Sequence, residues 1–281
     1  MSELSLVFFT VLAQSAVGLF ITLGLVELLA RPNTKAMNHM FLAVFVLLGL
    51  GAFASITHLG QPFRMMNVAF GLAHLSPLSL EIVALSLFSG ASFTYVVMRW
   101  FNILPERQTL VLVPAMMLGI VLILAVTHVY TLDTVPTWNS IWTAYQFLMT
   151  AFLVGPVAAI GLLRWKKKEV GEQYTRTITN GLAVASLIIM TLLLIGYVGY
   201  LFWLGQLDVQ GNPLAMVGYG QTVAMVRIFL IMSSVLTLAV STIRGNKGLP
   251  LAAGCFVFVL LAELAGRAFF YDIHLSAGSG M

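Results

Sequence analysis

The sequence predicts an all-α integral membrane protein, built as a polytopic bundle of eight transmembrane helices. Two observations lead to this fold class. Of the 281 residues, 60% are hydrophobic and only 9% are charged, which leaves too few polar side chains to cover a soluble domain. The hydrophobic residues also gather in runs that match the roughly 20 residues a helix needs to cross a bilayer. These runs are expected to be helical, because a lone strand cannot satisfy its backbone polar groups in lipid.

Eight such runs follow one another along the chain and form one predicted membrane domain over residues 1–281. The predicted spans cover residues 5–30, 38–58, 77–100, 108–130, 141–164, 177–204, 221–243 and 249–272. Small residues in three of these spans are expected to permit close helix contacts. They are Gly49, Gly51 and Ser55 in the second span, Ser89, Gly90 and Ala91 in the third, and Ala262 and Gly266 in the eighth.

The basic residues lie mostly in alternate loops. Eleven of the fourteen lysines and arginines fall in the loops after the first, third, fifth and seventh spans, whereas the opposite loops hold only Arg64. Cytoplasmic loops of membrane proteins are enriched in Lys and Arg, so both termini are predicted to lie outside the cytoplasm. This pattern also explains the net charge of +4. No segment offers the basic, aromatic surface of a nucleic-acid site, so the expected partner is the lipid bilayer and not nucleic acid.

Ionisable residues cluster at the outer edge between the second and third spans. His58 closes the second span, Arg64 lies on the loop, and Glu81 lies about one turn inside the third span, which Ser76 and Pro77 are expected to begin. Ionisable groups at this depth are costly and usually functional. A base, a carboxylate and a cation suit a quinol, whose hydroxyls need acceptors and whose protons must leave. The alternatives are a helix-capping role for His58 and a lipid-headgroup anchor for Arg64.

Three further charged residues lie within predicted spans. Glu263 and Arg267 are four residues apart, so they share a helical face and are predicted to neutralise each other. Arg227 has no partner in its own span and is expected to pair across the bundle, with Glu81 or Glu263. In the loop after the fourth span, Trp138 and Trp142 fit an interfacial aromatic belt. The alternative for these tryptophans is a wall for an aromatic headgroup or a docking surface for a partner.

Other cofactors receive less support from the residues. The single cysteine, Cys255, rules out a disulfide and an iron–sulfur cluster held by the protein's own cysteines, and no metal site is predicted. A bis-histidine haem needs two imidazoles that face each other, which only His58 and His128 could provide. A haem-bearing quinol–cytochrome anchor subunit of a respiratory reductase remains the alternative. A secondary transporter is less favoured, because the sequence lacks the inverted repeats of that class.

Four motifs carry a resemblance to a known family. They are THLGQPFR at 57–64, SLEI at 79–82, YTLDTVPTWNSIWT at 130–143 and ELAGRAFFY at 263–271. In these motifs, in length and in span number, the protein resembles the membrane-anchor subunit of bacterial dimethyl sulfoxide reductase. The resemblance implies a multi-pass protein of the bacterial inner membrane with periplasmic termini. It also implies an iron–sulfur electron-transfer subunit and a molybdopterin catalytic subunit, both on the periplasmic side.

The resemblance implies a function as well. Such an anchor oxidises menaquinol near the outer face, carries no haem, and passes electrons to the iron–sulfur subunit. His58 and Glu81 match the quinol site of the family, and Gly60 and Arg64 belong to the same motif. Asp133, Trp138 and Arg227 are further candidates for contact with the quinol. An anchor that runs in reverse and reduces quinone is an open alternative.

Overall fold

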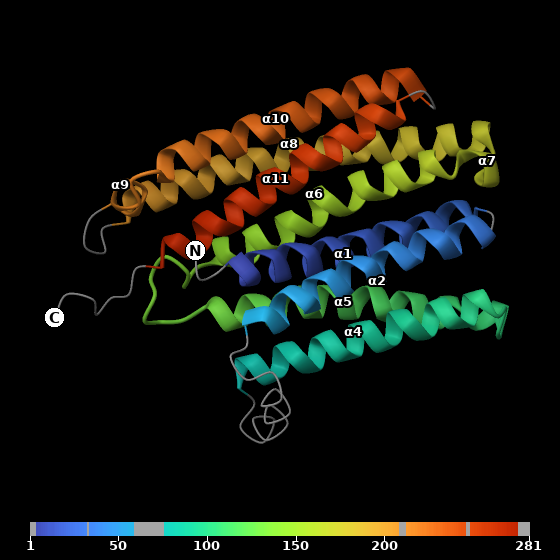
Figure 1. Ribbon diagram of the computed structural model, residues 1–281, viewed down its shortest axis with the longest axis horizontal. Coiled ribbons are helices and arrows are strands. Elements are labelled where there is room, and N and C mark those ends of the chain that lie inside the picture. The colour runs from blue at the N-terminus through green and yellow to red at the C-terminus, as the bar shows by residue number, and fades with distance from the viewer. Residues whose placement is uncertain (1–3, 33, 59–75, 208–211, 246–247, 275–281) are drawn as a thin grey trace.

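A computed structural model describes residues 4–32, 34–58, 76–207, 212–245 and 248–274, and the structural statements below concern these residues. They form a bundle of long antiparallel helices without strands (Figure 1). The long helices are α1 (Leu4–Ala30), α2 (Thr34–His58), α4 (Pro77–Trp100), α5 (Thr109–Tyr130), α6 (Ile141–Trp165), α8 (Glu172–Gln206), α10 (Gly220–Arg244) and α11 (Leu249–Asp272). Three short helices complete the described part of the protein: η3 (Pro105–Arg107), α7 (Lys167–Val170) and α9 (Pro213–Met216).

All eight predicted spans correspond to these long helices, each long and apolar enough to cross a membrane. The start of the third span is also confirmed, because the backbone N–H of Ser79 donates to the hydroxyl of Ser76 at 3.2 Å and Pro77 is the first helical residue. One boundary differs clearly from the prediction. Helix α8 begins at Glu172, before residue 177, because its polar first turns extend beyond the apolar run. Hydropathy therefore located the spans but not the polar end of this helix.

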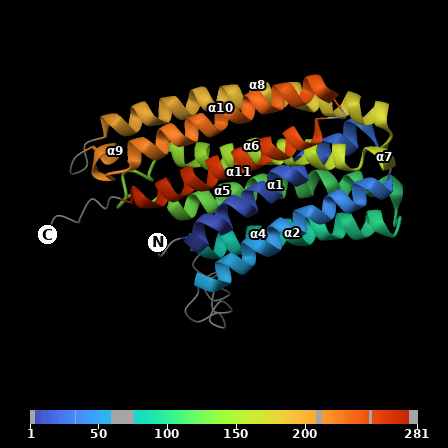
Figure 2. The same ribbon diagram turned by 45° about the horizontal axis from the view of Figure 1, so that its top comes forward.

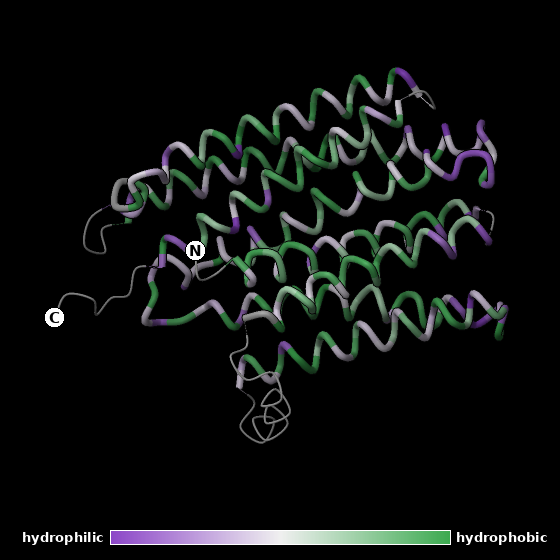
Figure 3. The backbone as a smooth tube through the Cα atoms, in the orientation of Figure 1, coloured by the Kyte–Doolittle hydropathy of each residue, from purple (hydrophilic) through white to green (hydrophobic). Residues whose placement is uncertain are grey.

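The two ends of the bundle differ in character. One end, here named the terminal end, holds the start of α1 and the end of α11; the other, named the basic end, holds the α1–α2 and α4–α5 connections and α7 (Figure 1). Hydrophilic residues concentrate around α7 and the α4–α5 turn (Figure 3). Two arginines assigned to basic loops by the sequence, Arg99 and Arg164, are instead buried in the last turns of α4 and α6.

The helices pack around two hydrophobic clusters. The first lies mainly among α1, α2, α4 and α5, the second lies among α6, α8, α10 and α11, and α6 contributes to both. Figures 1 and 2 show α6 and α11 beside α1, between the outer helices of the two groups. The two groups are therefore joined along α1 and α6.

The closest helix crossing is not among those expected from the sequence. A Cβ atom built on Gly18 of α1 would overlap the carbonyl oxygen of Ala151 in α6, and one built on Gly155 would overlap the backbone of Gly18. By contrast, Gly49 and Gly90 have no atom within 4 Å of an added Cβ. Close packing through small residues therefore occurs in this bundle, but its tightest point is the crossing of α1 and α6.

Candidate functional site

Glu81 is a buried carboxylate near the terminal end of α4. It lies one turn inside the Ser76 cap, and only 7% of its surface is exposed. The hydroxyls of Tyr130 and Tyr271 lie within electrostatic range of this carboxylate. No cation within the described residues forms a salt bridge with Glu81. The predicted pairing of Arg227 with Glu81 is therefore not found, and Arg227 pairs with Glu263 instead.

The structure describes only part of the predicted His58 motif. His58 is the last residue of α2, and its side chain lies outside the described part of the protein, as do Gly60 and Arg64 entirely. The end of α2 and the start of α4 lie at the same end of the bundle in both views (Figures 1 and 2). The backbone of His58 is therefore at the terminal end, where Glu81 lies about one turn inside α4.

An apolar hollow of about 280 Å³ lies between α1, α2 and α4. Its lining includes Leu85, which follows Glu81 by four residues and so lies one turn deeper on the same helical face. The complete lining is Phe9, Ala13, Phe45, Leu48, Gly49, Ala52, Leu85 and Ser89. The buried carboxylate of Glu81 thus lies one helical turn closer to the terminal end than an apolar hollow that could hold a hydrophobic ligand.

Trp138 is buried against α11 and is not part of an exposed aromatic belt. Its indole N–H donates to the carbonyl of Phe270 at 2.8 Å, and its ring stacks on that of Phe270 at a centroid distance of 5.1 Å. The neighbouring Thr137 hydroxyl donates to the carbonyl of Ile273 at 2.7 Å. The belt interpretation of Trp138 is therefore wrong, because these bonds fasten the α5–α6 connection to the end of α11.

Two tyrosines connect Trp138 to the surroundings of Glu81. The hydroxyls of Tyr130 and Tyr271 are hydrogen-bonded to each other at 2.8 Å, and the ring of Tyr130 packs edge-on against Trp138 at 5.5 Å. Asp133 lies in the same connection but is exposed, where its carboxylate accepts a hydrogen bond from the Asn139 amide at 2.9 Å. The structure thus packs Trp138 against Tyr130 and Tyr271 and leaves Asp133 on the surface.

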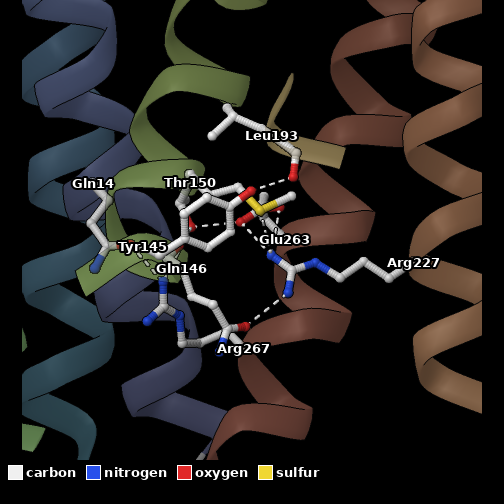
Figure 4. Close-up of polar contacts among 9 residues, drawn as sticks. Gln14, Tyr145, Gln146, Thr150, Leu193, Arg227, Glu263 and Arg267 are labelled. Atoms are coloured by element: carbon white, nitrogen blue, oxygen red, sulfur yellow. Dashed lines mark hydrogen bonds and ion pairs between the residues drawn. The ribbon is translucent and has the colours of Figure 1, made fainter. Parts of the chain in front are cut away.

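Arg227 forms a second polar site inside the bundle (Figure 4). It is 1% exposed, and its guanidinium donates to Glu263 of α11 at 2.9 Å and to Gln146 of α6 at 3.0 Å. The predicted pairing of Arg227 with Glu263 is confirmed. Gly266 makes room for this pair, since a Cβ at that position would overlap the Arg227 guanidinium.

The predicted neutralisation of Glu263 by Arg267 is wrong in its direct form. Arg267 points toward α1 and α6, where it donates to Gln14 of α1 at 2.7 Å and to the Thr150 hydroxyl at 3.1 Å (Figure 4). That hydroxyl in turn donates to Glu263 at 2.6 Å. Sharing a helical face permits a pair but does not require it, and here partners on α1, α6 and α10 separate the two side chains.

Several residues of these sites had no predicted role. Gln14, Gln146 and Thr150 are polar residues within predicted spans, and Tyr130 and Tyr271 lie inside motifs already singled out. A polar side chain inside an apolar span indicates a contact between helices, because such groups usually form hydrogen bonds with neighbouring helices. The hydrogen-bond partner of each residue depends on how the helices pack, and this packing cannot be read from the sequence.

The remaining histidines with described side chains are His39, His128 and His274. His39 is near the basic end of α2, His128 is exposed near the end of α5, and His274 packs against Trp138 at a centroid distance of 4.7 Å. The described residues contain no group of three or more His, Cys, Asp or Glu placed to hold a metal ion.

Comparison with known proteins gives the family. The model of the DMSO reductase anchor subunit (DmsC) family matches residues 1–273. The chain belongs to this family. It is therefore a multi-pass membrane anchor subunit of the bacterial inner membrane, in agreement with its eight apolar helices.

Individual relatives match over nearly the full length of this anchor subunit. It is 29% identical over 283 residues to an anaerobic dimethyl sulfoxide reductase subunit of Escherichia coli (strain K12), a match that spans 98% of the anchor and 96% of the relative. It is 30% identical over 286 residues to a subunit of the same name from Haemophilus influenzae (strain ATCC 51907 / DSM 11121 / KW20 / Rd), with the same coverage. No solved structure matches the anchor subunit.

Proposed function

We propose that this anchor subunit binds and oxidises menaquinol at its terminal end, which faces the periplasm. The electrons pass to an iron–sulfur subunit docked on that end, which feeds a molybdopterin-containing catalytic subunit. The names of the relatives, both subunits of anaerobic dimethyl sulfoxide reductases, support a place in such a complex. The anchor contributes the quinol site and the attachment to the membrane.

Glu81 is the observation that carries this proposal. A carboxylate buried in an apolar membrane helix is costly unless it has a function, and Glu81 has no cation partner within the described residues. The apolar hollow one turn deeper, about 280 Å³ in volume, suits the hydrophobic part of a quinol. A menaquinol placed there would present one hydroxyl to the Glu81 carboxylate while its apolar part packs between α1, α2 and α4.

His58 supplies the second proton acceptor in this proposal. Oxidation of the quinol to the quinone releases two protons and two electrons. An imidazole titrates near neutral pH and can take a proton from a hydroxyl, while the Glu81 carboxylate takes the other. Both residues belong to the terminal end, so both protons leave on that side. The electrons need an external acceptor, since the anchor has a single cysteine and this cannot hold an iron–sulfur cluster.

The other candidate residues receive more limited roles. Gly60 and Arg64 belong to the His58 motif, and we assign to Arg64 the task of setting the charge of the site. Trp138 supports the pair of Tyr130 and Tyr271, and Arg227 holds α10 against α11 through Glu263. Asp133 is exposed on the terminal end, which suits contact with the iron–sulfur subunit better than contact with the quinol.

Two substitutions test the quinol site in the purified complex. His58→Arg and Glu81→Lys are expected to abolish turnover driven by menaquinol and to weaken the binding of a quinol-analogue inhibitor. Turnover driven by a reduced dye, which donates electrons directly to the partner subunits, should remain. Glu172→Lys makes the same charge change as Glu81→Lys at an exposed site on the basic end, and it should leave both activities intact. Normal quinol oxidation and normal inhibitor affinity in either test variant would remove that residue from the site.

The haem-bearing alternative has a direct spectroscopic test. We expect the purified anchor to show no haem absorption, because the proposed route leads from the quinol to the cluster of a partner. A Soret band at stoichiometric intensity would support a cytochrome subunit instead and would contradict the proposed electron path.

A further inference from the structure

A second polar space lies at the basic end, far from Glu81. It is a hollow of about 440 Å³ between the end of α1 and the α4–η3–α5 turn. Its lining includes Glu27, Arg31, Tyr95, Glu106, Gln108 and Thr109. Both signs of charge are therefore present around one space, whereas the hollow beside Glu81 is apolar.

A buried ion pair lies beside this hollow and is incompletely satisfied. Arg99 is 4% exposed, and one nitrogen of its guanidinium donates to Glu27 at 2.5 Å and to the Tyr95 hydroxyl at 3.4 Å. The Nε and Nη2 atoms of Arg99 and the Oε2 atom of Glu27 are buried without a hydrogen-bond partner among the described residues. Buried polar groups of folded proteins almost always have a partner, and charged ones are the most costly to leave unpaired. Glu27 also lines the hollow and Arg99 does not, so Glu27 is the member of this pair that a ligand in the hollow would meet.

The walls of the hollow are fixed in unusual backbone conformations. The non-glycine residues with positive φ in the described part of the protein are Arg31, Asn102 and Leu104, and all three belong to the two turns that border this space. Such conformations cost energy and tend to persist at functional sites. The side-chain amide of Gln108 holds the turn in place by donating to the carbonyls of Met98 and Ile103 at 3.1 and 3.2 Å.

The surroundings of the hollow are those of a membrane surface. Trp100, Phe101, Ile103 and Leu104 expose their apolar side chains on the same turn, with Phe101 70% exposed. Acyl chains can cover these side chains, so a molecule with a polar head and hydrocarbon tails fits better than a free solute. The charges of Glu27 and Glu106 balance those of Arg31 and Arg99, which favours a head with no net charge.

We propose that this hollow is a binding site for a zwitterionic phospholipid, with a phosphoethanolamine head. The phosphate oxygens accept hydrogen bonds from the guanidinium of Arg31, which lines the hollow. The ammonium group donates to the carboxylates of Glu27 and Glu106, which both line the hollow. The acyl chains lie along the exposed apolar residues of the α4–η3 turn. This site is separate from the proposed quinol site, so either proposal can fail without the other.

Lipid retention by the purified complex tests the site. The complex is released from nanodiscs that contain equal amounts of phosphatidylethanolamine and phosphatidylglycerol, and bound lipids are counted by native mass spectrometry. Phosphatidylethanolamine should remain on the wild-type complex. Glu27→Gln and Arg31→Gln should each retain roughly tenfold less, which is the effect of losing one charge-assisted hydrogen bond. Arg107→Gln, an exposed arginine on the same turn that does not line the hollow, should retain as much as the wild type.

A second variant and a second measurement keep the test valid if Glu27→Gln misfolds. Arg31 is exposed and makes no salt bridge within the described residues, so Arg31→Gln should fold normally and still lose the lipid. Thermal unfolding of the wild-type complex should shift upward with added phosphatidylethanolamine and not with phosphatidylglycerol. Equal retention of both lipids would overturn the proposed selectivity. Stabilisation by soluble glycerophosphoethanolamine without any retained lipid would overturn the assignment to a phospholipid.

Discussion

Arg227 and Glu263 form a salt bridge in which both side chains are almost fully buried. Removal of one partner from such a pair leaves an uncompensated charge in a medium of low dielectric constant, which costs about 3–5 kcal/mol. Glu263→Gln is therefore expected to destabilise the anchor by roughly 3 kcal/mol, measured as the unfolding free energy in mild detergent. Glu172→Gln provides the control, because its pair with Lys167 is exposed and such pairs contribute about 0–1 kcal/mol.

The double variant separates a charge effect from a packing effect. Replacement of both Arg227 and Glu263 by methionine removes the two charges together and keeps much of their volume. It should be more stable than Glu263→Gln, since Glu263→Gln leaves Arg227 buried without its counter-ion and the double variant does not. If Glu263→Gln were as stable as Glu172→Gln, the pair would contribute little and the Thr150–Arg267 contacts would have to hold the helices.

At the level of single residues, the sequence predicted which side chains matter better than it predicted their partners. Glu81 lies at the predicted depth, and Arg227 pairs with one of its two predicted partners. The pairing of Glu263 with Arg267 failed because spacing along one helix ignores the neighbouring helices. The Arg267 guanidinium donates instead to Gln14 of α1 and to Thr150 of α6. These partners are known only once the helices are packed.

Among the helices, the crossing of α1 and α6 is the most demanding contact. Gly155→Ala would force a methyl group into the backbone of Gly18, so α1 and α6 would have to separate. Overpacking of this kind costs about 1–3 kcal/mol, and we expect Gly155→Ala to lower the unfolding free energy by that amount. Gly161→Ala is the matched control on the same helix, because nothing lies within 4 Å of an added Cβ there.

The two alanine substitutions should change the unfolding free energy in different ways. Alanine is favoured over glycine in a helix interior by about 1 kcal/mol, so Gly161→Ala should be neutral or slightly stabilising. A loss of stability at Gly161 equal to that at Gly155 would show that helix flexibility, and not the close crossing, is the cause. The measurement is the same detergent unfolding curve for both variants.

Elements were more predictable than contacts for a physical reason. Each span must be long and apolar to cross lipid, so hydropathy alone identifies it. The position of a glycine within a span does not reveal which helix packs against it. Gly49 and Gly90 face open space, whereas Gly18 and Gly155 pack against the backbone of a neighbouring helix. Likewise, hydropathy cannot define the polar first turns of α8, because those turns lie outside the apolar run.

For the whole molecule, orientation in the membrane decides on which side quinol protons are released and on which side the partner subunits dock. The basic end carries Arg31, Lys35 and Arg107 as exposed residues, and α7 adds Lys167 and Lys168. The terminal end carries the exposed acidic residues Asp133 and Asp272. Because basic loops stay in the cytoplasm, the basic end should face the cytoplasm and the terminal end the periplasm.

Reporter fusions test this orientation. Alkaline phosphatase is active only outside the cytoplasm, whereas green fluorescent protein exported in unfolded form stays dark. Phosphatase fused after Met281 should therefore be active and phosphatase fused after Lys168 should not, and the fluorescent protein should give the opposite result. A protein with eight crossings must return to the side from which it started, so a fluorescent fusion at Met281 would mean either inversion of the bundle or an odd number of crossings. Inversion would place Glu81 at the cytoplasmic face, because α4 begins at the same end at which α11 stops. Proton release from the quinol would then no longer occur on the periplasmic side.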